Sequence, residues 1–146
     1  MKKLLFLLVF IFSGCSLKTA FTYDPLYEKA LILTQRGQII NSLENKALID
    51  AVYLNELYNN KFKNVTFLIG VYNDFNNELT NKEFTLTLNN QKPTKISKKI
   101  PSFILYKNFP FHNEWMSYYI VEFNKTKKPY ILKYKSSNWG EVKFEF

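Results

Sequence analysis

The spacing of apolar positions changes along the chain, and its first regular stretch after residue 23 has the period of a helix. In residues 25–36, the apolar positions that recur at helical spacing are Leu26, Ala30 and Leu33. Asp24 and Pro25 are typical of a helix start, because an Asp side chain accepts hydrogen bonds from free backbone amides and Pro loses no bond at the first helical position. We predict a helix over residues 25–36 that ends at Gly37. An alternative helix continues past this glycine along Ile40, Leu43 and Ala47.

From about residue 46 onward the pattern has the period of strands. Residues 65–72 are apolar on both faces apart from one threonine and one glycine, which is typical of a central strand. Residues 84–88 alternate between apolar residues and threonine, which predicts a strand with one buried face. Asn-rich segments predict a loop at 73–81 and a tight turn at 89–90. The other predicted strands are 46–55, 92–98 at a sheet edge, 102–106, 118–123, 130–134 and 142–146.

Short strands separated by turn signals favour an antiparallel arrangement. We predict a mainly β protein in which an N-terminal helix is followed by a single antiparallel β-sandwich of immunoglobulin-like type, over residues 24–146. No second helix is expected. Residues 118–123 and 130–134 are expected to form a hairpin over the loop at 124–128.

The first sixteen residues have a different character. Two lysines precede an apolar run, residues 4–12, that is too short to cross a bilayer, which requires about 20 such residues. Two small residues follow, and then comes Cys15, the only cysteine of the chain. Residues 11–15 resemble the lipobox of bacterial lipoproteins, in which small residues precede a cysteine that becomes acylated. The position three before the cysteine is usually Leu, and here it is Phe12.

This resemblance implies a lipid anchor. Residues 1–14 would be a cleaved signal peptide, Cys15 would carry the acyl chains, and residues 15–23 would form a short tether. Two or three acyl chains hold a protein stably, at ~0.8 kcal/mol per buried methylene. Because lipoproteins with Ser at the place of Ser16 are commonly released to the outer membrane, we expect a cell-envelope protein anchored there and facing the periplasm.

The charge of the mature chain narrows its expected partners. Removing 14 residues from 146 leaves 132, which keep 18 of the 20 basic residues and all 12 acidic ones. This excess of positive charge suits anionic lipid headgroups, lipopolysaccharide phosphates or acidic polysaccharide. Nucleic acid is not expected as a partner of an exported, anchored protein. With Cys15 acylated, no disulfide is possible.

The sequence offers little for catalysis. It has one histidine, His112, which we interpret as a surface or loop residue, and its cysteine would be blocked by acylation. Motifs for a serine nucleophile, a zinc helix or a phosphate-binding loop are missing, and nothing singles out a pair among the 12 acidic residues. We therefore expect no enzyme, no cofactor and no metal site.

Two groups of residues are candidates for binding. The aromatic segment 109–115 contains Phe109, Phe111 and Trp115, which form either a contact loop for a partner or an apolar cap under the sandwich. Basic residues form a possible patch for anionic ligands, or else protect exposed strand edges from pairing. The residues of this predicted lysine patch are Lys92, Lys95, Lys98, Lys99, Lys127 and Lys128.

The chain also contains two Asn-x-Thr sequences, beginning at Asn64 and Asn124. The second has an acid, Glu122, two residues before the asparagine. Residues 122–126 therefore resemble the extended acceptor sequence of bacterial N-glycosylation, in a segment predicted to be an accessible loop.

Taken together, these features predict a lipid-anchored envelope protein with a non-enzymatic structural or protein-interaction role at the membrane surface, with an unidentified envelope protein as its partner. The alternative is a binding module for anionic glycolipid or polysaccharide. Lysines gathered with Phe111 and Trp115 around a groove would favour the alternative, and a flat apolar patch would favour the structural or protein-interaction role.

Overall fold

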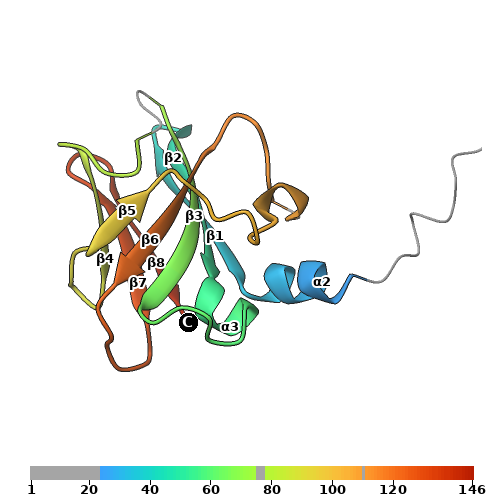
Figure 1. Cartoon of the computed structure of the whole chain (residues 1–146). Helices are drawn as coiled ribbons and strands as arrows, with labels where there is room; N and C mark the ends of the chain where they lie inside the picture. Colours follow the sequence, from blue (N-terminus) through green and yellow to red (C-terminus); the bar gives the residue numbers. More distant parts are fainter. Residues whose placement is uncertain (1–23, 75–77, 110) are drawn as a thin grey trace, which may run out of the picture.

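The computed structural model describes residues 24–74, 78–109 and 111–146 (Figure 1). Cys15, the predicted signal peptide and the predicted tether lie outside the described residues. Eight strands, two short α-helices and one turn of 3-10 helix make up the described part. In chain order they are α2 (Pro25–Ile32), β1 (Thr34–Asn41), β2 (Glu44–Tyr53), α3 (Leu54–Leu57), β3 (Val65–Asn73), β4 (Phe84–Leu88), β5 (Lys95–Ser97), η1 (Tyr106–Asn108), β6 (Ser117–Phe123), β7 (Ile131–Ser136) and β8 (Gly140–Glu145).

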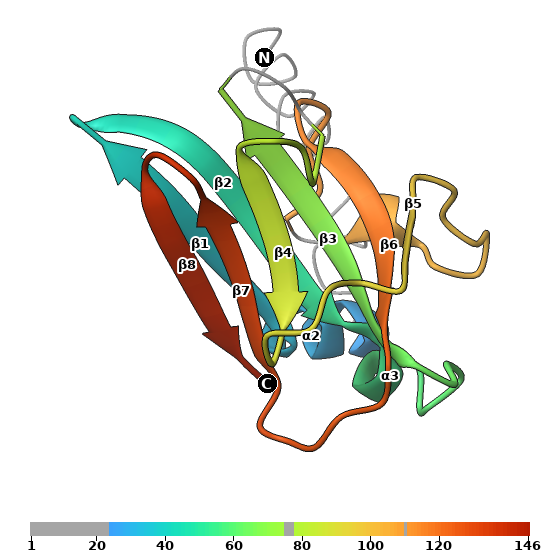
Figure 2. The same ribbon diagram turned by 90° about the vertical axis from the view of Figure 1, so that its left-hand side faces the viewer.

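The strands form two antiparallel sheets, so the protein is mainly β. One sheet has five strands in the order β1-β2-β3-β6-β5, and the other has three in the order β4-β7-β8. In Figure 2 the three-stranded sheet lies in front of β1 and β2. A cluster of buried side chains from both sheets fills the space between them, as in a sandwich.

Two predicted strands are confirmed with their burial patterns. Strand β3 lies in the middle of the five-stranded sheet, between β2 and β6, and its side chains are buried on both faces. Strand β4 has the predicted bounds and buries Phe84, Leu86 and Leu88 while Thr85 is exposed. The predicted closing strand is also present, as β8, and pairs with β7.

The first helix is shorter than its apolar spacing predicts. Helix α2 ends at Ile32, and residues 34–41 form strand β1 in place of both the predicted helix end and its alternative extension. Gly37 is not a helix stop: a Cβ added there would collide with Val142 and lie 2.9 Å from the ring of Phe144. The glycine therefore allows β1 to approach β8 closely, and this packing overrides the helical spacing.

The outer face of the five-stranded sheet is covered by α2, α3 and parts of the segment between β5 and β6 (Figure 1). The predicted strand at 102–106 is wrong, because this segment forms turns and η1 instead. The expectation of a single helix is also wrong, because a second helix, α3, begins at Leu54, directly after the end of β2 at Tyr53. Of the predicted edge strand at 92–98, only Lys95–Ser97 pairs, at the sheet edge.

The predicted hairpin of residues 118–123 and 130–134 is also wrong. Strand β6 pairs with β3 and β5, whereas β7 pairs with β4 and β8 in the other sheet. The segment 124–130 therefore crosses from one sheet to the other. It does so at the end of the sandwich that also carries α2, α3 and the C-terminus (Figures 1 and 2).

Candidate functional site

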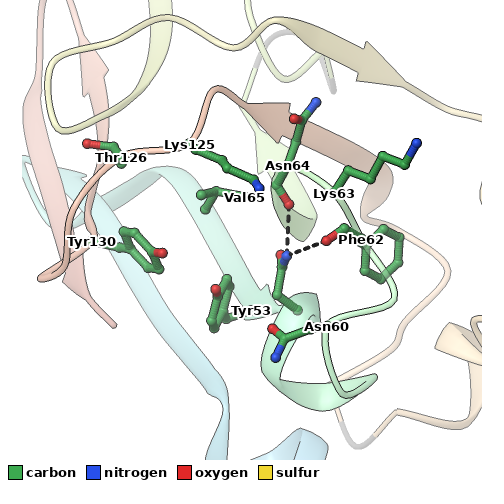
Figure 3. A pocket seen from close by; sticks show the side chains of 10 residues that line it. Tyr53, Asn60, Phe62, Lys63, Asn64, Val65, Lys125, Thr126 and Tyr130 are labelled. Carbon is green, nitrogen blue, oxygen red and sulfur yellow. Dashed lines mark hydrogen bonds between the residues drawn. The ribbon is translucent and has the colours of Figure 1, made fainter.

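A pocket of about 450 Å³ opens at this end of the sandwich (Figure 3). This volume lies within the range of small-molecule sites. The pocket forms where β2 ends, where β3 begins and where the β6–β7 segment passes. It is lined by Tyr53, Asn55, Asn60, Phe62, Lys63, Asn64, Val65, Lys125, Thr126 and Tyr130.

Two tyrosine rings form one side of the pocket, opposite Asn64 and Lys63 (Figure 3). The ring centroids of Tyr53 and Tyr130 lie 5.4 Å apart in an edge-on arrangement. Both backbone hydrogen bonds between Tyr130 and Phe146, of 3.0 and 3.1 Å, fix this part of the chain. Burial, together with the interaction with Tyr130, raises the pKa of the Tyr53 hydroxyl. This hydroxyl is therefore neutral at physiological pH.

Asn55, at the start of α3, holds the opposite wall in place. Its side-chain nitrogen donates hydrogen bonds to the carbonyl oxygens of Phe62 (3.2 Å) and Asn64 (2.8 Å), and its side-chain oxygen accepts from the backbone amide of Thr66 (2.8 Å). The turn between α3 and this wall has positive φ at Asn59 and Asn60, a conformation that Asn tolerates well. The polar wall is thus preorganised before any ligand binds.

A second pocket of about 450 Å³ adjoins the first and shares four of its lining residues. The residues that it adds are Lys29, Glu56, Asn59 and Lys128. We call the two adjoining pockets the end groove. The amino nitrogen of Lys128 lies 5.7 and 5.6 Å from the centroids of the rings of Tyr53 and Tyr130, where a cation is attracted by the ring faces.

The end groove has a positive balance of charge. Among the described residues that line it are four lysines, Lys29, Lys63, Lys125 and Lys128, and one carboxylate, Glu56. The amino group of Lys29 donates to the carbonyl oxygen of Glu56 (2.6 Å) and to the side-chain oxygen of Asn59 (3.3 Å). The Glu56 carboxylate lies 3.9 Å from the Lys128 amino group. The two lysines of the first pocket, Lys63 and Lys125, are exposed and face no carboxylate of its lining.

The predicted lysine patch is spread over the molecule rather than gathered in one pocket. Only Lys128 lines the end groove. Lys95 forms an ion pair of 3.4 Å with Glu122, and the amino group of Lys98 lies 5.5 Å from the ring of Tyr119. The carbonyl oxygen of Lys127 accepts a hydrogen bond from Asn89 (3.0 Å). Lys92 and Lys99 are exposed near the ends of β5.

The residues of the predicted aromatic loop do not reach the end groove. Phe109 is buried in the cluster on the outer face of the five-stranded sheet, and Phe111 packs against it with ring centroids 5.6 Å apart. Trp115 is 56% exposed and contacts the edge of Tyr72. His112, nearby, stacks on Tyr118 at 5.1 Å.

The sequence pattern does not predict the end groove, because its residues come from three separate stretches of the chain, at residue 29, residues 53–65 and residues 125–130. The pattern predicts strand positions for Tyr53 and Val65 and a strand end for Asn55, and nothing in it indicates that these positions surround a common space. One available signal was the occurrence of tyrosines near the ends of two predicted strands, with lysines in the adjoining loops.

Comparison with protein-family models, with curated proteins and with solved structures finds no match for this chain. Within residues 24–74, 78–109 and 111–146, no helix has the length and apolar character required to cross a membrane. The same residues contain no group of three or more His, Cys, Asp or Glu placed to hold a metal ion.

Proposed function

We propose that this protein is a lipid-anchored envelope protein of immunoglobulin-like fold that binds an anionic saccharide headgroup in its end groove, without catalysis. The observation that carries the proposal is the composition of the groove: two tyrosine rings, several asparagine amides, and four lysines against one carboxylate. This composition supports the alternative predicted from the sequence, a module for anionic glycolipid, although the aromatic residues are Tyr53 and Tyr130 and not the predicted Phe111 and Trp115.

The immunoglobulin-like assignment is supported by the order of the strands. In a constant-type immunoglobulin domain, strands A-B-E-D form one sheet and C-F-G the other. If β2 is taken as strand A, the remaining strands follow the same order, because β2-β3-β6-β5 lie in one sheet and β4-β7-β8 in the other. Strand β1 is then an addition beside strand A. The connection from β6 to β7 corresponds to the E–F crossing between sheets.

The chemistry of the groove suits a charged sugar. The half-buried ring of Tyr130, packed against the 7% exposed Tyr53, offers apolar surface to the C–H face of a sugar. Amides such as Asn60 offer both donors and acceptors to its hydroxyl groups. The lysine amino groups act as strong point charges for phosphate or carboxylate. Because the net charge of the lining is positive, a neutral sugar would leave the lysine amino groups without an anionic partner.

The position of the groove supports a membrane-bound ligand. Helix α2 contacts the groove directly, because Lys29 of α2 lines it. Asp24, just before α2, follows Cys15 by nine residues, a distance of at most roughly 30 Å in extended chain. If Cys15 is acylated, the groove hangs close to the membrane surface. The headgroup of a glycolipid in that same membrane is then the most accessible anionic saccharide.

A second candidate, docking of an envelope protein, is favoured by exposed apolar residues on α2. Leu31 is 56% exposed and Ile32 is 80% exposed. Surface apolar residues of this kind occur singly in many proteins, so they favour docking less strongly than the groove favours a saccharide.

The proposal is tested by titrating the mature acylated protein, residues 15–146 in non-ionic detergent, with the phosphorylated core oligosaccharide of lipopolysaccharide. Calorimetry should detect binding that weakens when the oligosaccharide is dephosphorylated. The double variant Lys63→Gln/Lys125→Gln should bind roughly 30-fold more weakly, if each lysine contributes about 1 kcal/mol.

The matched control is Lys98→Gln/Lys99→Gln, which removes the same charge from exposed positions of the predicted lysine patch outside the groove. This control should change the affinity less than about threefold. Equal losses in both double variants, or equal affinity for the dephosphorylated oligosaccharide, would contradict the assignment of the ligand to the end groove.

A further inference from the structure

The two Asn-x-Thr sequences lie in contrasting environments. Asn64 is half-buried, and its side-chain nitrogen donates to the carboxylate of Glu122 (3.3 Å). Thr66, the third residue of this sequence, is 1% exposed, and its hydroxyl donates to the carbonyl oxygen of Asn64 (3.1 Å). In the Asn64 sequence the threonine is therefore buried in β3 and the asparagine amide is bonded to Glu122, so the folded protein does not present this sequence to an enzyme.

The Asn124 sequence lies in the segment that crosses between the two sheets. Asn124 is exposed and follows directly on Phe123, the last residue of β6. Lys125 is exposed as well, Thr126 is half-buried, and residues 124–127 belong to neither a helix nor a strand. The side chain of Asn124 is thus accessible in the folded protein.

The acid before the asparagine distinguishes the two sequences a second time. Glu122 precedes Asn124 by two residues, whereas the corresponding position before Asn64 is occupied by Phe62. The Glu122 side chain is 27% exposed and forms the ion pair with Lys95 at the surface of the sheet. If a transferase acts before folding, the acid selects Asn124; if it acts after folding, accessibility selects the same residue.

We propose that Asn124 is a site of N-glycosylation by a bacterial oligosaccharyltransferase that requires an acid two residues before the asparagine. The co-substrate is a polyprenyl-pyrophosphate-linked oligosaccharide. A bond forms between C1 of the first sugar and the side-chain nitrogen of Asn124, and the bond from C1 to the pyrophosphate oxygen breaks. The amide nitrogen loses a proton, and polyprenyl pyrophosphate leaves. The proposal rests on the predicted export of the chain and does not depend on the ligand of the end groove.

The test uses the full chain with its own N-terminal segment, expressed in a bacterium that carries such a transferase together with its lipid-linked oligosaccharide. The protein is purified from the membrane fraction, its intact mass is measured, and the glycopeptide is then sequenced. We expect the mass to increase by one oligosaccharide attached at Asn124. Absence of any increase, in cells that modify a control acceptor, would overturn the proposal.

Variants assign the modification to the individual residues. Asn124→Gln should abolish it, and the matched change Asn64→Gln should leave it intact. Thr126→Val should abolish it whereas Thr126→Ser retains it, which separates loss of the hydroxyl from a failure to fold. Glu122→Gln should lower the modified fraction at least tenfold. A glycan at Asn64, or full occupancy without Glu122, would contradict the assignment. The readout of this test is protein mass and not affinity. Glycosylation of Asn124 can therefore be disproved while saccharide binding in the end groove is confirmed, and saccharide binding can be disproved while glycosylation is confirmed.

Discussion

Both faces of the five-stranded sheet are buried, but one face carries a neutral pair of polar side chains and the other carries a charged pair. On the inner face, toward the three-stranded sheet, the buried polar contact is neutral: Asn73 and Tyr134 bond at 3.1 Å. On the outer face, under α2 and the segment before β6, Asp50 is fully buried and carries a charged partner. Arg36 donates two hydrogen bonds to its carboxylate, of 2.6 and 2.7 Å.

The difference follows from what covers each face. A second sheet closes the inner face, so a charge there would lose its hydration with no route to water. The outer face is covered by short helices and loops, and Arg36, whose side chain is 51% exposed, connects Asp50 to solvent. A face covered by loops therefore accepts a charged pair that a face covered by a sheet would exclude. Three predictions test this comparison, from the largest expected effect to the smallest.

The largest effect is expected in the inner cluster. Phe67 is fully buried there, with ring centroids 5.1 Å from Phe146 and 6.1 Å from Phe123. Phe67→Ala should lower the free energy of unfolding by about 3–5 kcal/mol, because it leaves a cavity between two rigid sheets. Urea unfolding measures this value. Leu68→Ala, on the outer face, should cost less, since loops relax around a cavity more readily. A larger loss for Leu68→Ala would contradict the comparison.

The ion pair on the outer face should respond unequally to the removal of its two partners. Arg36→Met leaves the buried Asp50 carboxylate without its cation, and we expect it to cost about 3 kcal/mol or more. Asp50→Asn should cost about 1–2 kcal/mol, because the half-exposed Arg36 side chain can turn to water. Urea unfolding of both variants measures the asymmetry. The double variant Arg36→Met/Asp50→Leu should recover most of the lost free energy of unfolding. Equal losses in the two single variants would contradict the predicted asymmetry.

The smallest effect is expected from the neutral pair on the inner face. Burial raises the pKa of the Tyr134 hydroxyl above its ordinary value of 10.0, although the hydrogen bond with Asn73 acts in the opposite direction. A raised pKa means that the folded state holds the proton more tightly, so this contribution to stability is complete below about pH 10 and is lost as the pH rises further.

For this one group the free energy of unfolding should fall by about 1 kcal/mol between pH 10 and 11, because the unfolded hydroxyl is already half deprotonated at pH 10. Urea unfolding at a series of pH values measures the slope. Tyr134→Phe should be about 1 kcal/mol less stable at pH 7, because the hydrogen bond to Asn73 is lost, and should show a shallower decline above pH 10. An unchanged decline would mean that Tyr134 is not the group responsible.

The sequence by itself determined the elements whose pattern is local. The run at 65–72 is apolar on both faces, and only a strand with neighbours and cover on both sides satisfies such a run, so β3 could be predicted as central. The strict alternation at 84–88 determined β4 in the same way. The general class, mainly β with antiparallel sheets, follows from many such short segments separated by turns.

Only the tertiary structure decided where these elements meet. The helical spacing of residues 34–41 is overridden because β1 gains a full ladder with β2 and because Gly37 allows β8 to approach. A turn-rich segment such as 124–130 cannot reveal whether it closes a hairpin or crosses between sheets, since both require the same turn residues. The end groove depends on that crossing, because it brings Lys125 and Tyr130 to Tyr53, more than seventy residues earlier in the chain. Contacts over such separations leave no local period, and for this reason the groove could be found only in the folded protein.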